Sequence, residues 1–280
     1  MTRIDVKKTY KLYIGGAFPR SESGRTYEIN DSNGEFIANP AQASRKDLRD
    51  AVLAARTSLP GWSGATAFNR GQILYRVAEM MESRSGQFID EICALEGVTK
   101  TVAKKQIEES IDTWVWYSGW CDKISAIAGS TNPVSGPFYN FTTPESMGVI
   151  GVFAAQKPSL LGLVQALAPV LAGGNTAVVV TSQKFPLPAI SLSEVLATSD
   201  VPGGVVNILT GKTNELAPWM ASHMDVDGLD ISGLSKDVET QTRIEGTENL
   251  KRIHRFPDGN SPQRILAFME DKTVWHPVGI

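Results

Sequence analysis

Cysteine and histidine are scarce in this 280-residue chain, and their scarcity excludes several classes of protein. Two cysteines, Cys93 and Cys121, cannot form a disulfide framework and suit a reducing compartment, so we expect a cytoplasmic protein. The three histidines lie far apart in sequence and have no metal-ligand spacing. We therefore expect neither a disulfide-stapled fold nor a metal site.

The chain also lacks an excess of charge of one sign and an unbroken apolar segment. Its net charge is −3 and its basic residues are scattered, which argues against a nucleic-acid or anionic-membrane partner. The first residues contain no apolar h-region, so no signal peptide is expected. The longest apolar run, 160–180, is interrupted by Gln165, Pro169 and Asn175. A buried helix followed by a strand explains this run better than a transmembrane helix.

The stretch from Gly148 to Val180 organises the rest of the chain. It contains a short β-branched run, a helix-length apolar run and a second β-branched run, separated from each other by Pro158-Ser159 and Gly173-Gly174. This order is typical of a βαβ unit, and strands that are apolar on both faces indicate a parallel sheet covered by helices. The predicted class is α/β. A ligand site is expected beyond the carboxyl ends of the strands, at the loop 153–159.

Periodicity and turn residues predict the remaining elements. Short strands are expected at 11–14, 26–29 and 35–39, and helices at 44–59, 68–83, 86–95 and 99–124. A Gly/Ser/Pro-rich connection then leads to a strand at 138–143. After the βαβ unit, the pattern predicts a helix at 186–198, a turn and strand at 203–209, a helix at 214–223 and a strand at 228–232. We expect the alternation to stop there, because 235–260 is polar and offers little for a core.

The order of these landmarks resembles the aldehyde dehydrogenase superfamily. The resemblance runs from Tyr10 to Gly233 and implies a Rossmann-like NAD-binding domain, at 1–137 and 148–234. Its motifs are Leu12-Tyr-Ile-Gly-Gly-Ala, Ala51-Val-Leu-Ala-Ala-Arg, Pro60-Gly-Trp, Tyr117-Ser-Gly-Trp, Ala172-Gly-Gly-Asn-Thr and Pro202-Gly-Gly-Val-Val-Asn-Ile-Leu-Thr-Gly211.

The end of the sequence resembles a different part of the same superfamily. Phe268-Met-Glu-Asp-Lys-Thr-Val-Trp is similar to the C-terminal strand that follows the catalytic domain in complete members and joins a hairpin to form an oligomerisation arm. The resemblance implies an arm at 138–147 and 264–280, with a polar connection at 235–263 in place of the catalytic domain. The chain thus resembles the degraded second copy of tandem aldehyde dehydrogenases. The expected arm residues are Phe138, Tyr139, Phe141, Phe268, Lys272, Val274 and Trp275.

The resemblance implies no catalytic residue, because the segments that carry the family's nucleophile and general base have no counterpart. Cys93 lies in an apolar helical pattern and is expected to be a buried structural thiol. Cys121 follows Trp120, where family members usually carry a small residue. The aromatic group Trp114, Trp116, Tyr117 and Trp120 has helical spacing, which favours a core or a subunit interface over a ligand box.

The nucleotide contacts that the family implies are altered together. Ala155, Gln156 and Lys157 stand where the family has Pro-Trp-Asn, and Lys157 is expected to be a solvated loop lysine. Val180 stands at the ribose-binding lysine and cannot donate a hydrogen bond to a hydroxyl group. The pyrophosphate-cradling helix start reads Ile231-Ser-Gly-Leu, which keeps close backbone approach but loses a hydroxyl group. The candidate positions of this degenerate site are Ala155, Gln156, Lys157, Val180, Ser182, Gln183, Gly211, Ser232 and Gly233.

These observations favour a non-catalytic homologue that acts as an assembly or regulatory subunit. Its expected partner is a full-length aldehyde dehydrogenase subunit, with self-association through the arm as the other possibility. No cofactor is expected. The alternative hypothesis is a residual oxidoreductase or NAD sensor that binds NAD(P) weakly. A third is a decaying gene product, against which the intact caps and periodicity argue.

Overall fold

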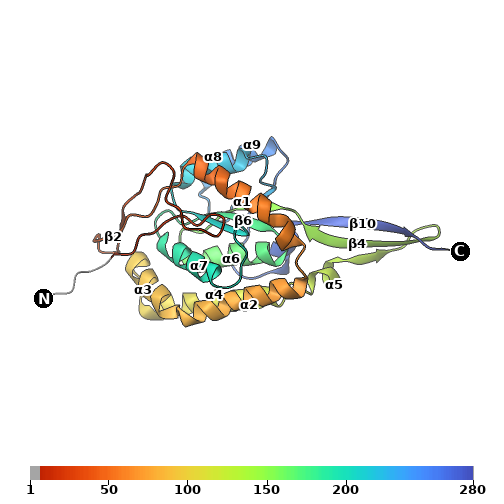
Figure 1. The fold of residues 1–280 in the computed structure, drawn as a ribbon, viewed down its shortest axis with the longest axis horizontal. Coiled ribbons are helices and arrows are strands. Elements are labelled where there is room, and N and C mark those ends of the chain that lie inside the picture. The colour runs from red at the N-terminus through yellow and green to blue at the C-terminus, as the bar shows by residue number, and fades with distance from the viewer. Residues whose placement is uncertain (1–6, 280) are drawn as a thin grey trace.

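The computed structural model describes residues 7–279, and its centre is a five-stranded sheet in the order β7-β6-β5-β8-β9. All four strand pairings are parallel, which confirms the predicted α/β class. Helices cover both faces of this sheet (Figure 1). Its strands are β5 (Val149–Phe153), β6 (Thr176–Val180), β7 (Val206–Leu209), β8 (Gly228–Asp230) and β9 (Arg252–His254).

The predicted βαβ unit is confirmed. Strands β5 and β6 are buried along their whole length and pair from Val149↔Thr176 to Phe153↔Val180, with α6 (Ser159–Ala172) between them. The helix ends because Gly174 takes a φ of +81°, a conformation that a residue with a Cβ rarely adopts. Apolar β-branched residues on both strand faces are buried here because each face packs against helices.

Two helical layers enclose the sheet. Figure 1 shows α1, α8 and α9 on one face and α2, α3, α4, α6 and α7 on the other. None of the helices formed by residues 7–279 combines the length and apolar character that crossing a bilayer requires. The helices not bounded above are α1 (Arg45–Ser63), α2 (Ala67–Ser83), α3 (Ser85–Glu96), α4 (Lys100–Ser118), α5 (Ile124–Ala128), α7 (Leu187–Ala197), α8 (Thr213–Ser222), α9 (Lys236–Thr247) and α10 (Pro262–Leu266).

The prediction that the alternation of strands and helices ends at residue 232 is wrong. Residues 235–260 form helix α9 and strand β9, and β9 adds the fifth strand by pairing in parallel with β8. Thr242 and Gly246 are the only buried residues of this helix, so the rest of it can be polar. A Cβ at Gly246 would lie 2.6 Å from the Ile253 side chain, so glycine allows this polar helix to approach the strand closely.

The predicted helix 99–124 is also corrected. It ends at Ser118, where the Gly119 N–H bonds to the carbonyl of Val115, and the chain turns before α5 begins. Trp114 and Tyr117 are fully buried in the core, and the Trp116 and Trp120 side chains pack against it. The aromatic group is therefore part of the core.

The N-terminal strands are shorter than predicted. β1 (Ile29–Asn30) pairs with β2 (Phe36–Ala38), whereas 11–14 contributes only isolated bridges. One bridge joins Tyr13 to Ile208 and covers the outer edge of β7. The first six residues of the predicted NAD-binding region, and residue 280 of the predicted arm, lie outside the described residues.

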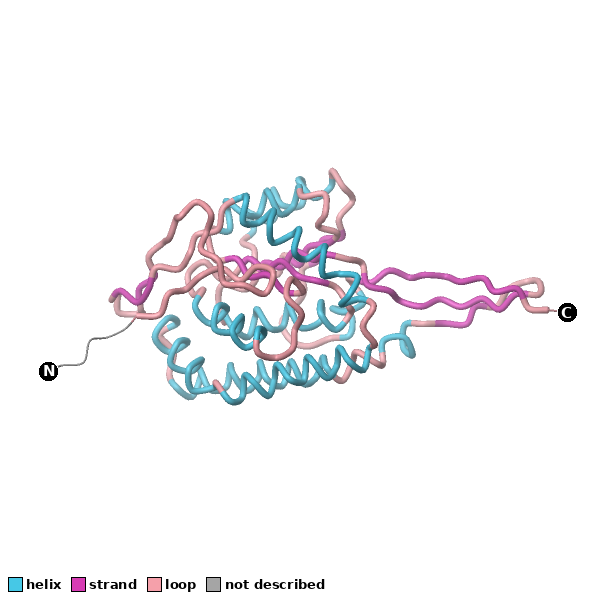
Figure 2. The backbone as a smooth tube through the Cα atoms, in the orientation of Figure 1, coloured by secondary structure: helices cyan, strands magenta, loops and turns pink. Residues whose placement is uncertain are grey.

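A separate three-stranded sheet, the arm, projects from the body of the molecule (Figure 2). Its order is β10-β4-β3, formed by β3 (Ser130–Asn132), β4 (Phe138–Ser146) and β10 (Met269–Pro277). The long antiparallel pair runs from Met269↔Ser146 to Pro277↔Phe138, which confirms the predicted pairing of the last strand with 138–143. β3 was not predicted, because it lies in the Gly/Ser/Pro-rich stretch.

Candidate functional site at the carboxyl edge of the sheet

Three strand-end loops meet at the carboxyl edge of the sheet. The Ala154 N–H bonds to the Val180 carbonyl, and the Gly233 N–H bonds to the Phe153 carbonyl, both at 3.0 Å. These bonds bring the loops that follow β5, β6 and β8 together. They surround a cavity of about 180 Å³ lined by Gln156, Gln183, Lys184, Thr213, Asn214, Gly233, Ser235 and Val238.

Gln156 ties two of these loops together through its own hydrogen bonds. The Ser182 hydroxyl donates to the Gln156 carbonyl at 2.9 Å, and the Gln183 N–H donates to Gln156 Oε1 at 3.0 Å. Gln183 Oε1 in turn accepts a bond from the Thr213 N–H at 3.3 Å, at the start of α8. The polar groups expected to contact a nucleotide are therefore partly occupied by contacts within the chain.

Lys157 is exposed, as expected, but its ammonium group is not simply solvated. Lys157 Nζ donates to the carbonyl of Glu96 at 2.9 Å. The buried Glu96 carboxylate accepts bonds from the backbone and the hydroxyl of Ser159, at 2.9 and 2.7 Å, and from Gln106 at 3.0 Å. The loop after β5 is thus pinned to the end of α3, and Lys157 does not line the cavity.

Two further candidate residues lie apart from the cavity. Val180 is 1% exposed and packs in the core on the α1 and α8 side of the sheet, so an apolar side chain suits its surroundings. A Cβ at Gly211 would lie 3.2 Å from the Ala43 backbone nitrogen, which places Gly211 against the segment before α1. Ala155 packs closely against α6: a Cβ placed on Gly162 would lie only 2.5 Å from the Cβ of Ala155.

Gly233 and Ser232 hold the loop after β8 in place. A Cβ at Gly233 would lie 2.1 Å from the Ala154 carbonyl oxygen, so glycine is required by the approach of two backbones, with or without a nucleotide. The Ser232 hydroxyl accepts a bond from the Phe256 N–H at 3.0 Å. Both residues therefore have structural roles that the sequence pattern could not separate from cofactor binding.

Asp230 is a buried ionisable residue at this edge that sequence reasoning missed. It ends β8, is 1% exposed and accepts a bond from the Ser232 N–H at 2.9 Å. Burial raises the pKa of this carboxyl group above its usual range. The available signal was an aspartate inside the apolar run Gly-Leu-Asp-Ile.

Neither cysteine of the chain lines the cavity. Cys121 is buried beyond the end of α4, and burial raises the pKa of its thiol to about 11. Cys93 is half-buried in α3 and packs against the core, so the expectation of a buried thiol is corrected in part. Among residues 7–279 there is also no group of three metal-binding side chains. A thiolate nucleophile at the edge is therefore absent from the described chain.

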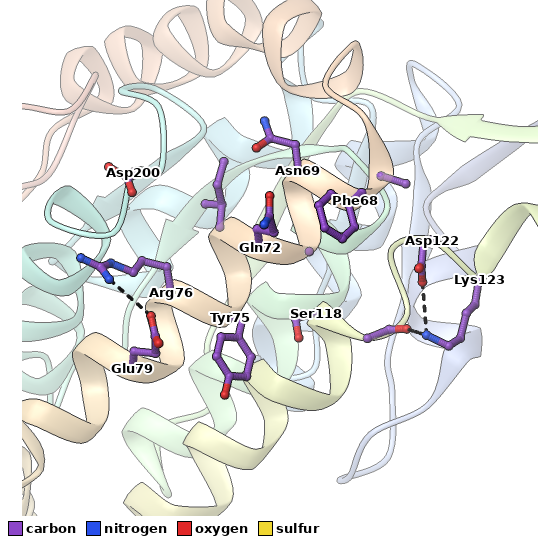
Figure 3. Close-up of a pocket in the computed structure, with 14 residues that line it drawn as sticks. Phe68, Asn69, Gln72, Tyr75, Arg76, Glu79, Ser118, Asp122, Lys123 and Asp200 are labelled. Carbon is purple, nitrogen blue, oxygen red and sulfur yellow. Dashed lines mark hydrogen bonds and ion pairs between the residues drawn. The ribbon is translucent and has the colours of Figure 1, made fainter.

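A larger groove lies elsewhere, along the outer surface of α2 (Figure 3). Its volume is about 810 Å³, and Phe68, Gln72 and Tyr75 line it with the end of α4. Its charges are largely paired with each other, since Arg76 bonds to Glu79 and Lys123 to Asp122, at 3.4 and 3.2 Å. None of the candidate nucleotide-binding residues lines this groove.

Comparison with known proteins agrees with this architecture. A sequence profile of the Aldehyde dehydrogenase family matches residues 18–275. An aldehyde dehydrogenase of Emericella nidulans is 30% identical over 99% of this chain and 56% of its own length. A cytosolic 10-formyltetrahydrofolate dehydrogenase of Pongo abelii is 32% identical over 94% of this chain and 30% of its own. The chain therefore spans about half, or less, of these relatives.

Solved structures show the same likeness. PnpE from Pseudomonas sp. WBC-3 superposes with a TM-score of 0.84 at 27% identity, over 88% of this chain and 50% of that one. PnpE has also been solved in complex with nicotinamide adenine dinucleotide, and the likeness of this chain to that structure has the same extent. With its parallel sheet, its motif order and a profile match over most of its length, the chain belongs to the aldehyde dehydrogenase family.

Proposed function

We propose that this protein is a non-catalytic homologue that works as an assembly or regulatory subunit of a complete NAD(P)-dependent aldehyde dehydrogenase. The observation that carries the proposal is the connection between the sheet and the arm. β9 ends at His254 and β10 begins at Met269, so residues 255–268, with the short helix α10, are all that joins them. This connection is too short to contain a catalytic domain, because a domain needs at least some 50 residues.

The carboxyl edge supports the same proposal. Its cavity of about 180 Å³ is smaller than the roughly 300–1,000 Å³ that small-molecule sites usually offer. Gln156 and Gln183 bond to the neighbouring loops, and Lys157 to Glu96, so binding a dinucleotide would require these contacts to be exchanged. Neither Cys93 nor Cys121 lines this cavity, so the edge offers no thiol nucleophile.

The arm supplies the surface for a partner. β10 is an edge strand, and its outer side is unpaired among the described residues. Phe138, Tyr139 and Trp275 are 43%, 50% and 58% exposed, while Phe141 and Val274 are half-buried and Lys272 pairs with Glu145. Phe268, the remaining arm candidate, is 1% exposed and lies in the core beneath the arm. A long exposed strand with aromatic side chains is a surface that proteins usually cover.

Co-expression with a full-length aldehyde dehydrogenase tests the proposal. We expect the two chains to co-elute in gel filtration and the partner's specific activity to change when this chain is present. Tyr139→Ala/Trp275→Ala should abolish co-elution, whereas Tyr75→Ala, which truncates an equally exposed aromatic residue on α2, should not. Separate elution of the two wild-type chains, with unchanged activity, would contradict the proposal. Free Cys93 and Cys121 agree with a cytoplasmic location, which fractionation would test.

The second candidate function is weak NAD(P) binding, either as a sensor or as a residual oxidoreductase. It is favoured by the Rossmann-like sheet and by Gly233, which keeps the close approach of the loops after β5 and β8. Calorimetric titration with NAD separates the two candidates. Micromolar affinity, abolished by a bulky substitution at Gln183, would favour a sensor. No heat and no thermal shift would favour the assembly subunit.

A further inference from the structure

A second cavity, of about 540 Å³, lies between the first turns of α1 and the last turn of α8. It is separate from the carboxyl-edge cavity, with which it shares no lining residue. Its volume falls within the range of roughly 300–1,000 Å³ that is typical of small-molecule sites. The side chains that the argument uses are Arg45, Lys46, Arg49, Trp219 and His223.

The charge of this cavity is positive. Three cations, Arg45, Lys46 and Arg49, face one carboxylate, Glu22, so the lining carries two net positive charges. Lys46 lies 3.7 Å from Glu22, and Arg49 lies 3.2 Å from Asp50. Arg45 has no ion-pair partner among residues 7–279, and its guanidinium carbon lies over the Trp219 ring, 3.8 Å from the ring centroid. One cation is therefore free to meet an anion.

Two of these cations occupy positions that the dipole of α1 disfavours. α1 begins at Arg45, so Arg45 and Lys46 occupy its first two positions, next to the positive end of the helix dipole. The acidic residue of this turn, Asp47, is used in the cap, where its carboxylate accepts bonds from the Ser44 N–H and the Ser21 hydroxyl. Such a local conflict between sequence and structure is expected where function requires it.

The cavity also offers a flat surface and a neutral donor. Trp219 is 41% exposed, and with the Arg45 guanidinium group over its ring it forms a platform of the kind that holds aromatic rings. His223 Nδ1 accepts a bond from the Asp225 N–H at 3.2 Å, which leaves the ring proton on Nε2. Desolvation lowers the pKa of His223, so the ring stays a neutral donor at pH 7.

We propose that the cavity between α1 and α8 binds a small organic anion that carries a flat ring. The ring lies on the Arg45–Trp219 platform, and Arg45, Lys46 and Arg49 bind the anionic group, which is either a carboxylate or a phosphate. The site is independent of the proposed assembly function. It uses side chains that neither the arm nor the carboxyl edge employs.

Calorimetric titration of the full chain at low salt tests this site with defined probes. We expect saturable binding of 2-naphthoate and of phenyl phosphate, and the tighter of the two identifies the preferred anion. Inorganic phosphate and neutral 2-naphthol, which each lack one of the two features, should bind at least about tenfold more weakly. Equal affinity for inorganic phosphate and phenyl phosphate would overturn the proposal, as would the absence of binding by both ring-bearing anions.

Substitutions then place the binding at this cavity. Arg45→Ala/Arg49→Ala should weaken binding of 2-naphthoate and phenyl phosphate by about tenfold or more. The melting temperature of the variant should stay close to that of the wild type, because loss of the Arg45 cation from the helix start offsets loss of its contact with Trp219, so loss of binding cannot be attributed to unfolding. Arg76→Ala, at an exposed arginine with one ion pair on α2, is the matched control and should bind like the wild type. Unchanged affinity in the double variant would refute the site.

Discussion

Asn175 connects the sheet to the arm, and its substitution should weaken both. It is fully buried between α6 and β6. Its Oδ1 accepts a bond from the Gly148 N–H at 2.8 Å, just before β5, and its Nδ2 donates to the Phe268 carbonyl at 2.9 Å, just before β10. One side chain thus ties together the starts of a central strand and of the last arm strand.

The cost of Asn175→Ala follows from these two bonds. The Gly148 N–H would lose its partner in a buried site, which costs about 1–3 kcal/mol. The Phe268 carbonyl would keep a bond from the Met147 N–H, so its loss is limited to an ordinary hydrogen bond of about 0.5–1.5 kcal/mol. We therefore expect the free energy of unfolding to fall by about 1.5–4.5 kcal/mol.

Urea denaturation followed by circular dichroism measures this change. The midpoint should fall with an unchanged slope, and amide hydrogen exchange should accelerate in β10 and β4. Asn132→Ala is the control, because its side chain bonds only within the arm, to Ser130, Asn140 and Thr142. A loss below about 1 kcal/mol for Asn175→Ala, or arm exchange identical to that of the wild type, would refute the reasoning.

Three further predictions concern single residues. Gly233→Ala should lower the free energy of unfolding by about 1–3 kcal/mol in thermal denaturation, because its Cβ would overlap the Ala154 carbonyl, whereas Gly86→Ala, which has open space, should not be destabilising. The Cys121 thiol has a pKa raised to about 11, so a thiol reagent at pH 8 should label Cys93 first; equal rates would contradict this. Desolvation lowers the pKa of Lys251 to about 8, below its unfolded value of 10.5, so its burial cost is present below pH 8 and disappears as the pH rises to 10.5. The stability of the wild type relative to Lys251→Met should therefore rise over this window by up to roughly 3 kcal/mol, and a flat difference would contradict the assignment.

The central elements of this fold could be predicted because their sequence signals are local. The β-branched runs around 149–153 and 176–180, the apolar helix between them and the glycines that end it all lie within one βαβ unit. The Ser44–Asp47 capping box was likewise readable, and both of its bonds are present at the start of α1. Local propensity and tertiary packing agree in these elements.

The elements that could not be predicted depend on distant partners. α9 looks like a solvated segment because its only buried residues are Thr242 and Gly246, and the glycine lies against the Ile253 side chain of the sheet. β9 reads as polar because it is an edge strand, where Arg252 extends to Glu270 at the base of the arm.

The contacts at the carboxyl edge could not be predicted from the sequence for the same reason. Gln156, Lys157 and Gly233 are placed by contacts with Gln183, Glu96 and Ala154, which lie far from them in sequence. A single sequence shows that these residues differ from the family motifs. It does not show that they bond to each other and to the neighbouring loops.

The arm also implies an order of events during synthesis. β4 is made before any strand of the central sheet, but its long partner β10 follows all five of them. While the ribosome completes the intervening segment, β4 has only the short β3 beside it, so the central sheet can form before the arm closes. The nascent chain therefore carries an open strand, on which a companion polypeptide or a chaperone could act before the molecule is finished.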